Sequence, residues 1–149
     1  MKVTIAQALE RGVTAHKEGK LQEAEKLYRA ILQSQPLHPD ANHNLGLIAV
    51  CVGKVEGAIP HFKAALAANA KMEQYWLSYI DALIKLNQMD TAKAVLEQAR
   101  TQGVWDERFD NLQVQLTDGA GSSLRVELDG LIALYQQGKY PEVLDKGAL

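Results

Sequence analysis

One short sequence pattern occurs twice in this chain, and its spacing limits the folds that the chain can adopt. The stretch GKLQEAEKLYRAIL begins at Gly19, and the similar stretch GKVEGAIPHFKAAL begins at Gly53, which is 53 − 19 = 34 residues later. A weaker third copy, NQMDTAKAVLEQA, begins at Asn87 after the same interval. A fixed period of this length is typical of proteins that are built from stacked copies of one small structural unit.

Each 34-residue unit is predicted to contain two helices, because its apolar residues recur at the spacing of an α-helix rather than alternating. In the first unit Gly19 separates two apolar stripes, and Pro36 ends the second stripe because proline cannot continue a helix. The second unit predicts helices over about 40–52 and 56–68, with Asp40 as the start signal. The third unit predicts helices over about 73–86 and 90–102.

Small residues recur at matching positions in these helices, and they would allow the two helices of a pair to approach closely. These residues are Gly12, Gly46, Ala24, Ala58 and Ala92. The aromatic residues Tyr28 and Phe62 would fill the space beside them. One helix pair cannot bury its own apolar stripe, so we expect neighbouring pairs to stack and to share a continuous core.

The stretches NLGLIAVCVGKVEGAIPHFKAAL and YRAILQSQPLHPDA resemble tetratricopeptide repeats, a family of 34-residue helix–turn–helix units. The resemblance covers residues 5–104 as three repeats, of which the second matches best and the third lacks the turn glycine. It implies an all-α fold in which antiparallel helix pairs form a right-handed superhelix.

The 34-residue register is lost after residue 104, and this change divides the chain into three parts. Residues 1–104 hold three helix pairs, and residues 105–123 hold an inserted helix and a link that contains Gly and Ser. Residues 124–149 resemble a fourth helix pair that stops early. We therefore expect the chain to be a fragment of a longer protein, with a natural short end as the alternative.

The charge and hydropathy patterns argue against several classes of partner. The net charge is −2 and the 16 Lys and Arg residues are scattered, so we expect no nucleic-acid partner. The longest apolar run, LIAVCV, is far shorter than the roughly 20 residues of a membrane helix, so we expect no membrane partner. The single cysteine, Cys51, and the lack of a secretory signal lead us to expect a cytoplasmic protein.

No residue pattern in the chain predicts catalysis, a cofactor or a metal site. His43 and Cys51 share a helix face, but eight residues at ~1.5 Å each place them ~12 Å apart, too far for a thiolate–imidazole pair. The four histidines show no metal-ligand spacing. We expect Cys51 to behave as a small, buried or half-buried apolar residue.

The family resemblance also implies where a partner would bind. In such proteins the first helix of each repeat lines a concave groove that holds an extended or helical peptide. The matching positions form what we call the groove face, namely Ala6, Leu9, Glu10, Val13, Lys17, Asp40, His43, Asn44, Leu47, Cys51, Gln74, Leu77, Ser78, Asp81 and Lys85. Its floor is apolar, and its edges carry both acidic and basic side chains. We therefore expect a peptide or protein partner with an amphipathic or apolar segment.

One subclass of this family grips the acidic C-termini of chaperones with a clamp of two Lys, two Asn and one Arg. The positions of this chain that match the clamp are Leu9, Val13, Asn44, Gln74 and Ser78. Only Asn44 fits, so a terminal carboxylate would find almost no charge-assisted hydrogen bond there. We therefore do not expect this chain to bind chaperone tails.

Three hypotheses about function follow from the resemblance. The first is a non-catalytic module that binds proteins, and the second is the substrate-selecting arm of a larger protein-modifying transferase. The second draws on a likeness to O-linked N-acetylglucosamine transferase, whose asparagine ladder Asn44 matches on one rung, or to sulfotransferase-like proteins. The third is a scaffold that self-associates through apolar surface at an open C-terminal end, such as Leu131, Leu134 and Val143.

Overall fold

The computed structural model describes residues 3–128 of the 149-residue chain. The chain divides into two compact units, residues 1–105 and 106–149. The first unit contains six helices, and their bounds are α1 (Ile5–Lys17), α2 (Leu21–Ser34), α3 (Pro39–Cys51), α4 (Val55–Ala68), α5 (Glu73–Lys85) and α6 (Met89–Thr101). No strand occurs among residues 3–128, so the described part of the chain is all-α.

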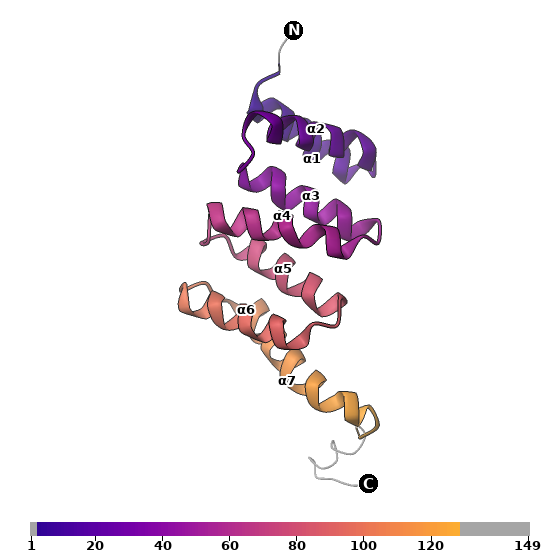
Figure 1. The fold of residues 1–149 in the computed structure, drawn as a ribbon, viewed down its shortest axis with the longest axis vertical. Coiled ribbons are helices and arrows are strands. Elements are labelled where there is room, and N and C mark those ends of the chain that lie inside the picture. The colour runs from indigo at the N-terminus through magenta and orange to yellow at the C-terminus, as the bar shows by residue number, and fades with distance from the viewer. Residues whose placement is uncertain (1–2, 129–149) are drawn as a thin grey trace. The chain divides into compact units, whose positions relative to one another are not determined.

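Within the first unit the helices form three successive pairs (Figure 1). Each helix packs against the next one in the chain, and α3 also contacts both α1 and α5. The odd-numbered helices α1, α3 and α5 therefore make one layer of the unit. This arrangement confirms the all-α helical solenoid that the 34-residue period predicts.

The tight turns inside the three helix pairs share one geometry. Gly19 and Gly53 have φ angles of 80° and 84°, and Asn87 has a φ of 61° at the equivalent place. The left-handed region is open to glycine and is tolerated by asparagine, which explains how the third repeat turns without a glycine. The first turn closes with a 2.8 Å hydrogen bond from the Lys20 N–H to the Ala15 carbonyl, and the other two turns repeat it at 2.8 and 2.9 Å.

The start of α3 differs from the prediction, which gave Asp40 as the start signal. The helix begins at Pro39, and His38 caps it by accepting a 3.1 Å hydrogen bond from the Ala41 N–H at ring atom Nδ1. Proline favours the first position of a helix because its φ angle is already helical and it has no N–H to satisfy. The Asp40 carboxylate instead accepts a hydrogen bond from the Tyr75 hydroxyl.

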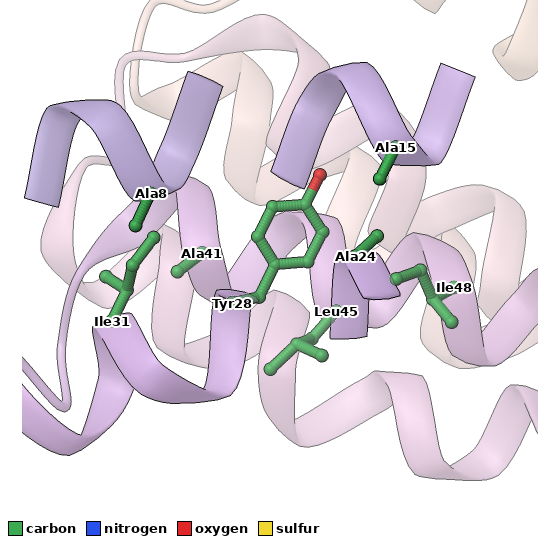
Figure 2. Close-up of a cluster of buried hydrophobic side chains, with 8 residues drawn as sticks. All are labelled: Ala8, Ala15, Ala24, Tyr28, Ile31, Ala41, Leu45 and Ile48. Atoms are coloured by element: carbon green, nitrogen blue, oxygen red, sulfur yellow. The ribbon is translucent and has the colours of Figure 1, made fainter. Parts of the chain in front are cut away.

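The core depends on the close approach of paired helices, as predicted from the small residues. Tyr28 and Phe62 are fully buried, and Figure 2 shows Tyr28 among side chains from α1, α2 and α3. A methyl group added at Gly12 would lie 2.6 Å from Tyr28 Cε1, and one added at Gly46 would lie 2.8 Å from Phe62 Cδ1. Each aromatic ring therefore occupies the space that a side chain on the facing helix would need.

The third helix pair uses a different combination at the same positions. Ile80 replaces the glycine and Leu96 replaces the aromatic residue, and both side chains are buried. A branched side chain facing a smaller partner can fill a similar volume to a glycine facing a ring. This exchange keeps the pair packed although the third repeat matches the sequence pattern least well.

The second unit begins with α7 (Glu107–Leu128), and the predicted link at residues 117–123 falls within the range of this helix. The structure continues one helix through that segment, because Gly and Ser weaken a helix without ending it, and no proline occurs between residues 106 and 128. At its start, Asp106 accepts a 2.8 Å hydrogen bond from the Arg108 N–H, and bonds from Arg108 lower the pKa of this carboxyl. The predicted partial fourth pair, 124–149, lies almost entirely outside the described residues, and Leu131, Leu134 and Val143 all do.

We expect Gly46→Ala to lower the free energy of unfolding by about 1–3 kcal/mol, because the added methyl group overlaps Phe62. The matched control is Gly57→Ala, since a methyl group there meets no atom within 4 Å and Gly57 lies in α4. That control should gain roughly 0.5–1 kcal/mol from the lower flexibility of alanine in the unfolded chain. Urea unfolding of both variants measures the difference, and equal effects would contradict the packing described here.

The turn at Asn87 gives a second prediction. Asn87→Gly should leave the free energy of unfolding unchanged or slightly higher, because glycine adopts a positive φ at no steric cost. Asn87→Val should lower it by about 1–2 kcal/mol, because a β-branched residue fits the left-handed region poorly. Thermal and urea unfolding followed by circular dichroism would measure both, and a valine variant as stable as the glycine variant would refute the turn geometry.

Candidate functional site

The predicted groove face lies on α1, α3 and α5, and its residues differ widely in exposure. The half-buried members are Leu9, Val13, Asp40, Asn44, Leu47 and Leu77. The exposed members are Ala6, Glu10, Lys17, Cys51, Gln74, Asp81 and Lys85. The two remaining residues, His43 and Ser78, are buried, with 5% and 7% of their surface exposed.

Four aliphatic side chains give this face its apolar character. They are Leu9 and Val13 on α1, Leu47 on α3 and Leu77 on α5, and each is partly exposed. Charged residues of both signs accompany them, including an ion pair on α5 in which Lys85 Nζ lies 2.9 Å from Asp81 Oδ2. An exposed pair of this kind adds little to stability, so both charges can exchange partners at low cost.

A polar joint between α3 and α5 is formed by His43, Ser78 and Tyr75, which are buried, and by Asp40, which is half-buried. His43 Nε2 lies 2.8 Å from Ser78 Oγ, and the Tyr75 hydroxyl donates to the Asp40 carboxylate. Asp40 and His43 are three residues apart on α3, and their partners are three residues apart on α5. The two contacts therefore lie about one helical turn from each other on the same pair of helices. His43 and Ser78, predicted as groove contacts, therefore bind each other instead of facing solvent.

Aromatic rings enclose the His43 imidazole. Its centroid lies 4.8 Å from that of Tyr75 and 5.6 Å from that of Phe62. Burial lowers the pKa of His43, and a hydrogen bond with Asn44 and the charge of Asp40 oppose this effect only in part. Burial, followed by the bond to Asp40, raises the pKa of Tyr75. His43 and Tyr75 are thus both neutral at pH 7, which suits groups in a site with little water.

Two other histidines occupy comparable places in the first unit. His16 Nδ1 lies 3.4 Å from the Tyr28 hydroxyl, and His61 Nδ1 lies 3.0 Å from Asn42 Oδ1. Burial lowers the pKa of both rings. The sequence analysis missed these pairs, although a histidine opposite a tyrosine or an asparagine at core positions is a recognisable signal for a buried polar contact.

Cys51 differs from its predicted state. It is exposed rather than buried or half-buried, because it is the last residue of α3 and the chain turns away immediately after it. His43 on the same helix is buried, so burial as well as distance separates the two side chains. Within residues 3–128 no group of three or more His, Cys, Asp and Glu side chains could hold a metal ion. No helix in that range has the length and apolar content needed to cross a bilayer.

These features define a class of protein: a solenoid of helix pairs whose first helices present a partly apolar, partly charged face. Sequence models of the tetratricopeptide repeat match residues 9–71 and 52–116, and together they span most of the chain. The chain belongs to the tetratricopeptide repeat family. No curated protein matches it significantly.

Solved structures agree with this assignment. The first such domain of Spaghetti (RPAP3), bound to the HSP90 peptide SRMEEVD, has 19% identity and a TM-score of 0.71, covering 79% of this chain and 96% of that one. The Sgt2 domain from Aspergillus fumigatus has 16% identity and a TM-score of 0.70, covering 97% and 90%. The Yersinia enterocolitica chaperone SycD, in complex with a YopD peptide, has 16% identity and a TM-score of 0.67, covering 85% and 98%. At these identities the likeness establishes the fold.

The buried histidines predict that stability depends on pH. Because burial lowers the pKa of His16, His43 and His61 below the ordinary value of 6.5, the unfolded chain binds more protons than the folded chain as pH falls. Their contribution is fully present above pH 6.5 and is lost as pH falls towards the folded-state pKa values. Urea unfolding between pH 7.5 and 5.5 should therefore show a falling free energy of unfolding.

The variant His43→Gln should reduce this pH dependence, since glutamine keeps hydrogen-bonding capacity and does not titrate. Its absolute stability is a separate matter, because the glutamine fills the ring site differently. A wild-type free energy of unfolding that stays constant from pH 7.5 to 5.5 would contradict the burial of neutral imidazoles.

Proposed function

We propose that this chain is a non-catalytic interaction module that binds a segment of another protein along the groove face of α1, α3 and α5. The observation that carries the proposal is the row of partly exposed aliphatic side chains, Leu9, Val13, Leu47 and Leu77, on three successive first helices. Such a row would meet apolar anchors spaced along an extended or helical segment. Exposed charges beside the row would fix the orientation of the segment.

Two of the similar structures support a peptide as the partner. The RPAP3 domain is bound to an HSP90 peptide, and SycD is in complex with a peptide of YopD. The family fold thus accommodates short segments of other proteins. The chemistry of the segment depends on the side chains of each chain and has to be argued from this one.

The groove face favours an apolar or amphipathic segment over an acidic C-terminus. At the five positions of the carboxylate clamp, this chain has Leu9, Val13, Asn44, Gln74 and Ser78. Ser78 is buried against His43, so Asn44 and Gln74 are the polar side chains at these positions that can reach a ligand. Neither is a cation, so a terminal carboxylate would lose its water without gaining a charged partner.

The polar joint supports the proposal in a second way. A hydrogen bond between His43 and Ser78, and one from Tyr75 to Asp40, fix the spacing of α3 and α5, which carry Leu47 and Leu77. A surface whose spacing is set before binding loses less conformational entropy when the partner docks.

The test is a peptide selection against the full chain, followed by anisotropy measurements with the selected peptides. In the double variant Leu47→Glu, Leu77→Glu we expect affinity to fall by a factor of at least about 100, because two carboxylates would replace buried apolar contacts. Selected peptides should be rich in aliphatic and aromatic residues and should not require a free C-terminal carboxylate.

The matched control is Leu37→Glu, which adds a carboxylate at a residue that is 70% exposed and lies outside the groove face. This variant should bind as well as the parent chain. Circular dichroism of all three proteins separates lost binding from lost folding. If the double variant keeps its helices and still binds the selected peptides, the partner docks elsewhere and the proposal fails.

A further inference from the structure

A second concave surface lies away from the groove face, where α4 and α6 flank α5. We call it the outer hollow. It has a volume of about 470 Å³, and its lining comes from α4, α5, α6 and the residues next to these helices. None of the groove-face residues lines it. Its volume falls in the range of about 300–1,000 Å³ that is typical of sites for small molecules.

The preceding repeat differs at two of the positions that line this hollow. There Asn42 and His61 form a hydrogen bond, and Trp76 and Val95 occupy the positions 34 residues later. The polar bridge is thus replaced by an aromatic ring and an aliphatic side chain, which make this part of the lining apolar.

Small residues widen the outer hollow further. Ala67 on α4 and Ala94 on α6 line it, and both are exposed. In the preceding repeat Gln33 and Pro60 stand at the matching positions, and both are bulkier.

The lining of the outer hollow is mainly apolar. Trp76 and Tyr79 of α5 line it together with Leu66 and Val95. The Trp76 side chain is 5% exposed, and its ring nitrogen already donates a 2.8 Å hydrogen bond to the Ala70 carbonyl, so the ring lines the hollow with apolar atoms and leaves no buried donor unpaired.

Lys63 is the only charged side chain in the lining of the outer hollow. It forms no ion pair within the described part of the chain. The amide side chains of Gln98 and Gln102 add hydrogen-bonding groups. An apolar surface with one unpaired ammonium group complements a ligand that has an apolar body and one negative charge.

We propose that the outer hollow binds a small anionic amphiphile, with its apolar body against Trp76, Tyr79 and Val95 and its charged group beside Lys63. This site is separate from the groove face and does not depend on the proposed peptide binding. A medium-chain carboxylate has the required chemistry, and octanoate is the simplest probe.

The experiment titrates octanoate, and octanol as its neutral counterpart, into the full chain carrying Trp105→Phe. This substitution leaves Trp76 as the only tryptophan, so its fluorescence reports on the outer hollow directly. We expect saturable changes with octanoate, and weaker binding of octanol. Lys63→Gln should weaken octanoate binding by about two- to fivefold and leave octanol unaffected, as expected for an exposed charge contact.

Two further variants test the location. Ala67→Glu fills the hollow and adds a repelling charge, so octanoate affinity should fall at least tenfold. If this variant folds poorly, Ala94→Glu places the same charge in the hollow from α6 and should have the same effect. The matched control is Ala68→Glu, because Ala68 is the exposed neighbour on α4 that does not line the hollow. It should bind like the parent.

Three outcomes would overturn the proposal. The first is that Trp76 fluorescence shows no saturable change at millimolar octanoate. The second is that Ala67→Glu and Ala68→Glu lose the same amount of octanoate affinity. The third is that octanol binds as tightly as octanoate. The groove variant Leu47→Glu, Leu77→Glu should bind octanoate normally. A loss of octanoate binding in that variant would place the ligand on the groove face and would also refute the outer site.

Discussion

The close approach of paired helices is the constraint on which the rest of the structure depends. Tyr28 lies against the Gly12 backbone, and Phe62 lies against that of Gly46, so near that no side chain fits between ring and helix. The core packs at high density only if every such pair keeps this fit. A pair that is spaced correctly presents a matching surface to the next pair, so these local contacts support the stacking of the repeats.

The joint between the second and third pairs is polar, and this affects both stability and function. His43 and Ser78 contact each other and, together with Asp40 and Tyr75, hold α3 against α5. Buried hydrogen bonds of this kind add only modest net stability, but they penalise any other alignment of the two helices because a misaligned group would stay unpaired. His43 and Ser78 are therefore not exposed on the proposed groove face, and they instead connect the helices that carry it.

The proposed groove face and the outer hollow of the first unit arise from different parts of the repeat. The groove face uses the first helix of each repeat, whereas the outer hollow forms where second helices flank a first helix. Repetition places the proposed groove face on the same helix of every repeat, but it does not make the outer positions alike. Asn42 and His61 form a polar bridge in the second repeat, and Trp76 and Val95 stand at the matching positions of the third repeat, where they line the outer hollow. Divergence between copies can therefore give one repeat a lining that the repeat pattern itself does not contain.

The sequence by itself determined the period, the helix pairs, the turns and the buried aromatic residues, because these depend on spacing and on residue size within about 34 positions. The family resemblance assigns positions to a groove face, but it does not determine which of these side chains are exposed. The states of His43, Ser78 and Cys51 were decided by the tertiary structure. Whether a polar side chain meets solvent or a partner depends on residues 35 positions away on a neighbouring helix, and only the packed repeats bring those residues together.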